Sequence, residues 1–147
     1  MTRLVALAGL VIAAAAFGAY VVETEPRWYE RARYPLRYEH IIRAHAENYR
    51  LEPQLIAAVV YQESKFDADA VSSSGAVGLM QLLPSTAQGI ADRTGGRGWQ
   101  ESDLLDPELN VRYGSWYLRH LLDKYGDERL ALAAYTVSYT HLTLPTN

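Results

Sequence analysis

The chain has 147 residues, which suits one domain with short extensions, and 49% of them are hydrophobic, which allows a single core. Its net charge of −3 argues against a nucleic-acid-binding protein, because such proteins usually present a basic face. The chain has no cysteine, which excludes disulfides and thiolate metal sites but leaves the compartment open.

An uncharged, mostly apolar segment opens the chain. After Arg3, residues 4–22 form a run of nineteen residues without a charge, and about 20 apolar residues can span a bilayer as a helix. Because the run is N-terminal and stops abruptly at Glu23, we expect residues 1–22 to be a signal anchor or signal peptide rather than a buried helix. Small residues at 14–16 have the spacing of a cleavage site, but the apolar run continues beyond them, which favours an uncleaved anchor.

The arginines around this segment leave its orientation open. Only Arg3 precedes the run, whereas four arginines follow it within residues 27–37, and the positive-inside rule would then argue against export. A short basic N-terminus followed by an apolar run is instead typical of an export signal. Residues 23–37 are charged and aromatic, which suits a juxtamembrane stalk.

Two helices are expected next. The first covers residues 38–50, where apolar and aromatic side chains recur at helical spacing. The second begins at Pro53, because proline is favoured at the first position of a helix, and runs to about Ser64. Val59 belongs to its apolar stripe, and Glu63 lies four residues later on the same stripe.

Residues 65–78 contain few helix formers and a Ser-Ser-Ser-Gly run, so we expect a loop there. Three further helices are then indicated by proline or aspartate at their starts and by glycine at two of their ends. They begin at Pro84, Pro107 (after Asp106) and Asp127, and end at Gly95-Gly96, Gly126 and Tyr135. No segment before residue 136 shows a sustained strand pattern, so the folded part is predicted to be all-α.

Glu63 is the candidate residue with the clearest chemistry. A carboxyl group in an apolar site can remain protonated and act as a general acid, although a structural glutamate at the edge of the core is the alternative. The loop that follows carries Ser72 and glycines that let backbone approach a ligand, and the amide of Gln81 can both donate and accept hydrogen bonds. An acid beside neutral donors and acceptors suits a sugar substrate.

Other candidate sites are weaker. His40 and His45 are five residues apart, which does not fit the spacing of a helical metal pair, so no metal site is predicted. Residues 95–98 follow no strand and are expected to be a plain loop rather than a phosphate-binding one. The aromatic residues around Tyr113 and Trp116 are more typical of a core than of a platform for a sugar.

Short motifs follow one another in a specific order between residues 38 and 135, about two-thirds of the chain. They are Glu63-Ser64 with Phe66, Ser72-x-x-Gly75-Ala76-x-Gly78-Leu79-Met80-Gln81, Pro84-x-Thr86-Ala87, Asp106-Pro107, Asn110-Val111, Gly114, Tyr117-Leu118 and Ala134-Tyr135. This ordered set resembles the lysozyme-like lytic transglycosylases with an SLT domain, which cut bacterial peptidoglycan. The resemblance implies an all-α, lysozyme-like helical domain.

The resemblance also implies a mechanism. Glu63 would be the single catalytic acid and base, which protonates the oxygen between N-acetylmuramic acid and N-acetylglucosamine. It would then take the proton of the muramoyl C6 hydroxyl as a 1,6-anhydro ring closes. Ser72 would bind near the muramoyl group, Gln81 would line the groove, and Tyr135 would form a hydrogen bond near Glu63.

No metal and no cofactor are implied, and the expected partner is the glycan strand of peptidoglycan. Because peptidoglycan lies outside the cytoplasmic membrane, the resemblance places the domain on the periplasmic or extracellular face, anchored through the N-terminal helix or secreted. That location settles the orientation that the arginines left open.

The sequence departs from the family pattern at two places. Ala68 stands where proline is frequent, and Thr136 follows Tyr135 where the family continues with Asn-Ala-Gly. We therefore expect a transglycosylase domain at 38–135 that is incomplete at its C-terminus, and a non-family tail at 136–147 that is foreign or disordered. Two alternatives follow: an inactive, membrane-anchored module that binds peptidoglycan, or a hydrolase similar to goose lysozyme.

Overall fold

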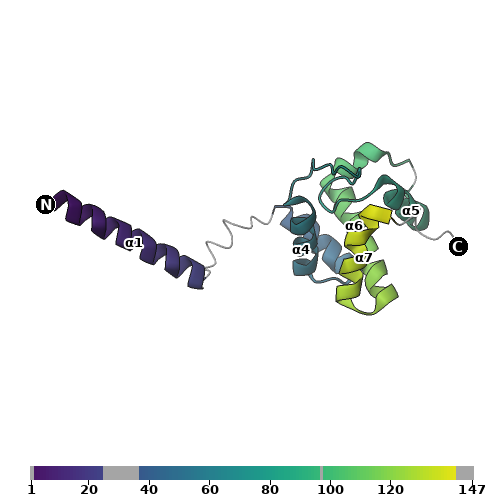
Figure 1. Cartoon of the computed structure of the whole chain (residues 1–147). Coiled ribbons are helices and arrows are strands. Elements are labelled where there is room, and N and C mark those ends of the chain that lie inside the picture. The colour runs from purple at the N-terminus through teal and green to yellow at the C-terminus, as the bar shows by residue number, and fades with distance from the viewer. Residues whose placement is uncertain (1, 25–36, 97, 142–147) are drawn as a thin grey trace. The chain divides into compact units, whose positions relative to one another are not determined.

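The computed structural model describes residues 2–24, 37–96 and 98–141 (Figure 1). The chain divides into two units, Met1–Leu36 and Arg37–Asn147. In the first unit, helix α1 spans Thr2–Thr24 and contains most of the predicted anchor segment. Over the residues described, no helix combines the length and the apolar character needed to cross a membrane. Nearly all of the predicted stalk and residues 142–147 lie outside the described residues.

Over the described residues, the regular elements of the second unit are all helices. Its helices are α3 (Glu39–Tyr49), α4 (Pro53–Ser64), α5 (Pro84–Thr94), the short 3₁₀-helix η1 (Glu101–Leu105), α6 (Pro107–Tyr125) and α7 (Glu128–His141). Isolated bridges, rather than strands, join Val77 to Val71 and Leu82 within the described part of the chain. The all-α prediction is therefore confirmed, and η1 is an element that the sequence did not predict.

Local capping interactions explain where these helices begin and end. The Asp106 carboxylate accepts a hydrogen bond of 2.9 Å from the N–H of Leu109, and Asp127 caps α7 in the same way. Gly126 ends α6 with a φ of 63°, a left-handed conformation that glycine adopts without steric cost. The predicted starts and stops of α6 and the start of α7 are thus confirmed.

Helix α6 is the centre of the domain. It packs against α3, α5, α7 and η1, and Figure 1 shows α6 and α7 side by side. Tyr113 and Tyr117 on α6 are only 3% and 4% exposed, which confirms their predicted place in the core. The loop between α4 and α5 buries Leu79 and Met80 in the same core, so this part of the loop belongs to the core.

Helix α7 does not end at Tyr135, as the sequence predicted, but continues to His141. Residues 136–141 contain neither glycine nor proline, and the next helix breaker is Pro145. The backbone therefore has no local signal to stop the helix where the family motif stops.

Candidate active site

Glu63 is the penultimate residue of α4 and is half-buried. The helix ends directly after it, because Lys65 and Phe66 both adopt left-handed conformations, with φ of 54° and 64°. Such conformations cost non-glycine residues about 1–2 kcal/mol each, so tertiary contacts must hold this turn. Phe66 supplies one such contact, because its side chain is 4% exposed and packs in the core.

Ser64 ties the end of α4 to the following loop. Its hydroxyl oxygen lies 2.8 Å from the carbonyl oxygen of Leu79 and 3.1 Å from that of Val60, and both carbonyls accept its hydrogen bond. Because Ser64 is buried and directly follows Glu63, this bond keeps the glutamate close to the Leu79–Met80 segment.

Gln81 holds the loop together from inside. Its side chain is 6% exposed, and its amide nitrogen donates hydrogen bonds of 3.0 Å to Ala70 and 2.9 Å to Gly78, both to carbonyl oxygens. The family resemblance implied that this amide lines a groove, and no role inside the loop was predicted for it. The two bonds engage the amide nitrogen and leave its carbonyl oxygen Oε1 out of this hydrogen bonding.

Ser72 stands in a tight turn of the same loop. Its hydroxyl oxygen accepts a 3.0 Å hydrogen bond from the N–H of Ala76 and lies 2.9 Å from the hydroxyl oxygen of Ser74. Gly75, with a φ of 81°, lets the turn close and donates its N–H to the Ser72 carbonyl at 3.0 Å. The half-buried Ser72 hydroxyl is thereby fixed in position by the loop's own hydrogen bonds.

Asn110 on α6 positions the loop between α4 and α5, a role that the sequence did not predict. Its side chain is fully buried, and its oxygen accepts a 2.8 Å hydrogen bond from the N–H of Met80. Its nitrogen donates to the carbonyls of Val77 and Leu104, at 2.9 and 2.8 Å. A Cβ atom at Gly78 would collide with Asn110 and with the Leu104 carbonyl, so glycine is needed there for space as well as for its φ of 79°.

Tyr135 on α7 completes the support of the loop. It is 1% exposed, and its hydroxyl donates a 3.0 Å hydrogen bond to the carbonyl oxygen of Met80. Its ring lies against Tyr117, with 5.5 Å between the ring centroids. Segment 79–80 is thus held by α4 through Ser64, by α6 through Asn110 and by α7 through Tyr135.

These contacts bring three of the four predicted site residues to one loop. Ser72 and Gln81 belong to the loop itself, and Tyr135 bonds to Met80. Glu63 adjoins it through the bond between its neighbour Ser64 and Leu79. The arrangement joins the end of the helix that carries Glu63 to a loop with hydroxyl and amide side chains, and a carboxyl group can transfer protons on a neutral, polar substrate.

The histidines do not form a common site. His40 is exposed on α3, whereas His45 is buried and its Nε2 lies 2.7 Å from a carboxylate oxygen of Glu108 on α6. Over the described residues, no group of three or more histidine, cysteine, aspartate or glutamate side chains is placed to hold a metal ion.

Residues 40–141 match the family described as the transglycosylase SLT domain. The chain is 39% identical over 136 residues to membrane-bound lytic murein transglycosylase F of Maricaulis maris, an alignment that covers 86% of this chain and 27% of that protein. It is 38% identical over 100 residues to the transglycosylase of Enterobacteria phage PRD1, covering 68% of this chain and 34% of the phage protein. The chain therefore spans about a third or less of the length of these relatives.

Solved structures show the same fold. Lytic transglycosylase Slt of Pseudomonas aeruginosa, determined as an inactive glutamate-to-glutamine mutant, superposes with a TM-score of 0.71 at 32% identity, over 80% of this chain and 20% of that one. The 70 kDa soluble lytic transglycosylase of Escherichia coli gives a TM-score of 0.70 at 29% identity, over 76% and 18% of the two chains. The fold predicted from the sequence motifs is thus confirmed.

Proposed function

The chain belongs to the transglycosylase SLT domain family, and we propose that it cleaves the β-1,4 bond between N-acetylmuramic acid and N-acetylglucosamine in peptidoglycan. The observation that carries this proposal is the half-buried Glu63, placed beside a loop segment that three helices hold rigid. Similar proteins named lytic murein transglycosylases support the choice of substrate.

Glu63 acts first as an acid and then as a base. Its protonated carboxyl donates to the glycosidic oxygen as the bond from that oxygen to the muramoyl C1 breaks. The muramoyl C6 hydroxyl then attacks C1 and gives its proton to the Glu63 carboxylate, which closes the 1,6-anhydro ring and restores the acid. The inactive mutant of the Pseudomonas relative, in which glutamine replaces a glutamate, supports one essential glutamate.

A single carboxyl group is sufficient for this route, whereas most glycosidases use two. The acidic residues nearest to Glu63 in the sequence, Asp67 and Asp69, are exposed. The Asp67 carboxylate accepts a 3.1 Å hydrogen bond from the N–H of Asp69, as in an ordinary loop turn. These residues are therefore assigned no part in the reaction.

The neutral groups around Glu63 orient the sugar. Ser72 accepts from the Ala76 N–H, which leaves its hydroxyl hydrogen to donate to the muramoyl group or to Ser74. Gln81 offers its Oε1 as an acceptor on the groove wall. Tyr135 forms a hydrogen bond near Glu63 and holds the Met80 carbonyl.

We place the domain outside the cytoplasmic membrane, where peptidoglycan lies. Similar proteins are named membrane-bound lytic murein transglycosylases, which supports a location in the cell envelope. In this proposal residues 1–22 are the anchor or signal, and residues 38–135 carry the reaction.

Digestion of purified sacculi tests the proposal. Mass spectrometry should find soluble muropeptides with 1,6-anhydro ends, and Glu63→Gln should release none, because glutamine cannot donate or accept the proton. Products with reducing ends would show a hydrolase similar to goose lysozyme. Binding to sacculi without release of products by the unaltered chain would show a binding module.

A further inference from the structure

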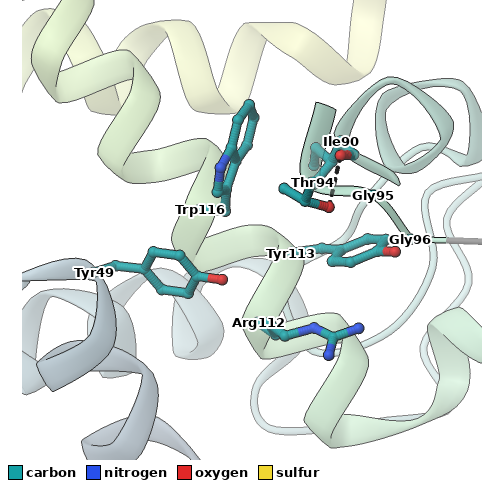
Figure 2. A pocket seen from close by; sticks show the side chains of 8 residues that line it. All are labelled: Tyr49, Ile90, Thr94, Gly95, Gly96, Arg112, Tyr113 and Trp116. Atoms are coloured by element: carbon teal, nitrogen blue, oxygen red, sulfur yellow. Dashed lines mark hydrogen bonds between the residues drawn. The ribbon is translucent and has the colours of Figure 1, made fainter. Parts of the chain in front are cut away.

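A pocket of about 330 Å³ lies where α3, α5 and α6 meet, and Figure 2 shows its lining. Tyr49 comes from α3, Thr94 from the end of α5, and Arg112, Tyr113 and Trp116 from α6. Ligand pockets usually measure about 300–1,000 Å³, so this one suits a single sugar ring or a group of similar size.

The pocket lies on the side of α6 that faces away from the catalytic loop. Gly114 faces that loop, because a Cβ atom at Gly114 would collide with the side chain of Met80. Arg112 and Trp116 are each two residues from Gly114, which is about 200° around a helix, and they are four residues apart on one face. The pocket is therefore distinct from the site at Glu63.

The polar groups of the pocket favour an anionic ligand. None of the lining residues is acidic, and among the described residues the exposed Arg112 guanidinium forms no ion pair. It lies 5.3 Å from the centre of the Tyr113 ring, a cation–π contact that leaves its N–H groups available. A planar guanidinium in this setting can bind a carboxylate through two parallel hydrogen bonds.

The Tyr49 hydroxyl adds a neutral donor beside this cation. Burial raises the pKa of Tyr49, so its hydroxyl keeps its proton at neutral pH. The positive charge of Arg112 acts on the same pKa in the opposite direction, and Figure 2 shows both side chains among those that line the pocket.

Trp116 supplies an aromatic wall. His120 stacks on its indole, with 5.4 Å between ring centroids and 7° between the planes. Trp116 is half-buried: it packs against the core, as predicted, and also lines the pocket. Aromatic walls with a few polar groups are typical of small-molecule sites.

We propose that this pocket binds a sugar ring that carries a carboxylate arm, and that it holds a glycan strand away from the site of cleavage. A muramoyl unit with an unsubstituted lactyl group is such a ring. That the ligand belongs to a peptidoglycan strand rests on the proposed function. That the ligand has a sugar ring and a carboxylate rests on the pocket alone.

Nuclear magnetic resonance of the full chain labelled with ¹⁵N tests this inference. N-acetylmuramic acid and N-acetylglucosamine share the ring and differ by the lactyl ether that carries the carboxylate, so they form a matched pair of probes. N-acetylmuramic acid should shift the amide signals of Gly95 and Gly96 and the indole N–H of Trp116. We expect it to bind about tenfold more tightly than N-acetylglucosamine, the low end of the effect of a charged hydrogen bond.

Substitution of two exposed arginines, one inside and one outside the pocket, tests whether Arg112 binds the carboxylate. Arg112→Gln should remove the preference for N-acetylmuramic acid, whereas Arg129→Gln on α7 makes the same charge change outside the pocket and should keep it. Equal affinity for both sugars, a preference that survives Arg112→Gln, or no shift of the pocket signals would each overturn the inference.

The cleavage site and the pocket can fail independently. If the unaltered chain cleaves sacculi but neither sugar reaches the pocket, only the inference about the pocket is wrong. If the pocket binds N-acetylmuramic acid and sacculi remain intact, only the proposed function is wrong. Binding in the pocket should also persist in Glu63→Gln, because that residue is remote from it.

Discussion

Replacing Asn110 by leucine should destabilise the domain by about 3 kcal/mol. The leucine keeps the volume of the side chain but removes the hydrogen bonds of Asn110 to two buried backbone groups, the Met80 N–H and the Leu104 carbonyl. The Val77 carbonyl retains a hydrogen bond of 3.0 Å from the N–H of Leu82. A buried unsatisfied group costs about 1–3 kcal/mol, so two groups cost about 2–6 kcal/mol.

Urea unfolding of the full chain, followed by circular dichroism, measures this loss. A change of about 3 kcal/mol is a large part of the roughly 5–15 kcal/mol that keeps a domain folded, so the midpoint should fall clearly. Asn48→Leu is the matched control, because Asn48 is exposed on α3 and its substitution should change the free energy of unfolding by less than about 0.5 kcal/mol. A loss below about 1 kcal/mol for Asn110→Leu would refute the role assigned to its hydrogen bonds.

Other substitutions test the same support and the pocket. Tyr135→Phe removes the hydrogen bond to the Met80 carbonyl and should lower the free energy of unfolding in urea by about 1 kcal/mol. The rate at which sacculi are digested should fall about tenfold, and an unchanged rate would exclude Tyr135 from the site. Gly78→Ala should destabilise more than Gly75→Ala, because both have positive φ but only Gly78 lacks space for a Cβ; equal losses of thermal stability would contradict the collision. Burial raises the pKa of Tyr49 above 10.0, so the folded state holds the tyrosine proton more tightly than the unfolded state does. The stability that this proton contributes is therefore complete below pH 10.0 and is lost at higher pH. Tyr49→Phe should remove this part of the alkaline loss of stability, and an unchanged pH profile of the free energy of unfolding would count against the effect.

The sequence by itself determined where the α-helices of the second unit begin, and it determined the catalytic candidate. Pro53 and Asp106 mark helix starts through the backbone groups that a first turn leaves unpaired, and Gly126 marks an end through a conformation that other residues avoid. Glu63 stood out because a carboxyl on an apolar helical stripe is unusual. These signals depend only on residues that are close in the sequence, so they can be recognised without the tertiary structure.

The end of α7 shows the limit of local signals. A family motif stops at Tyr135, but the helix continues to His141, because a helix ends at a cap or a breaker rather than at a motif.

Only the tertiary structure decided how the site is held and where the pocket lies. Asn110 reaches Met80 across 30 residues and Tyr135 reaches it across 55, and no spacing in the sequence encodes such hydrogen bonds. The Gln81 amide nitrogen donates to the carbonyls of Ala70 and Gly78 inside the loop, because buried carbonyl groups are stable only when they are hydrogen-bonded. Trp116 lines a pocket because three helices cross there, which depends on packing angles that a single chain segment does not contain.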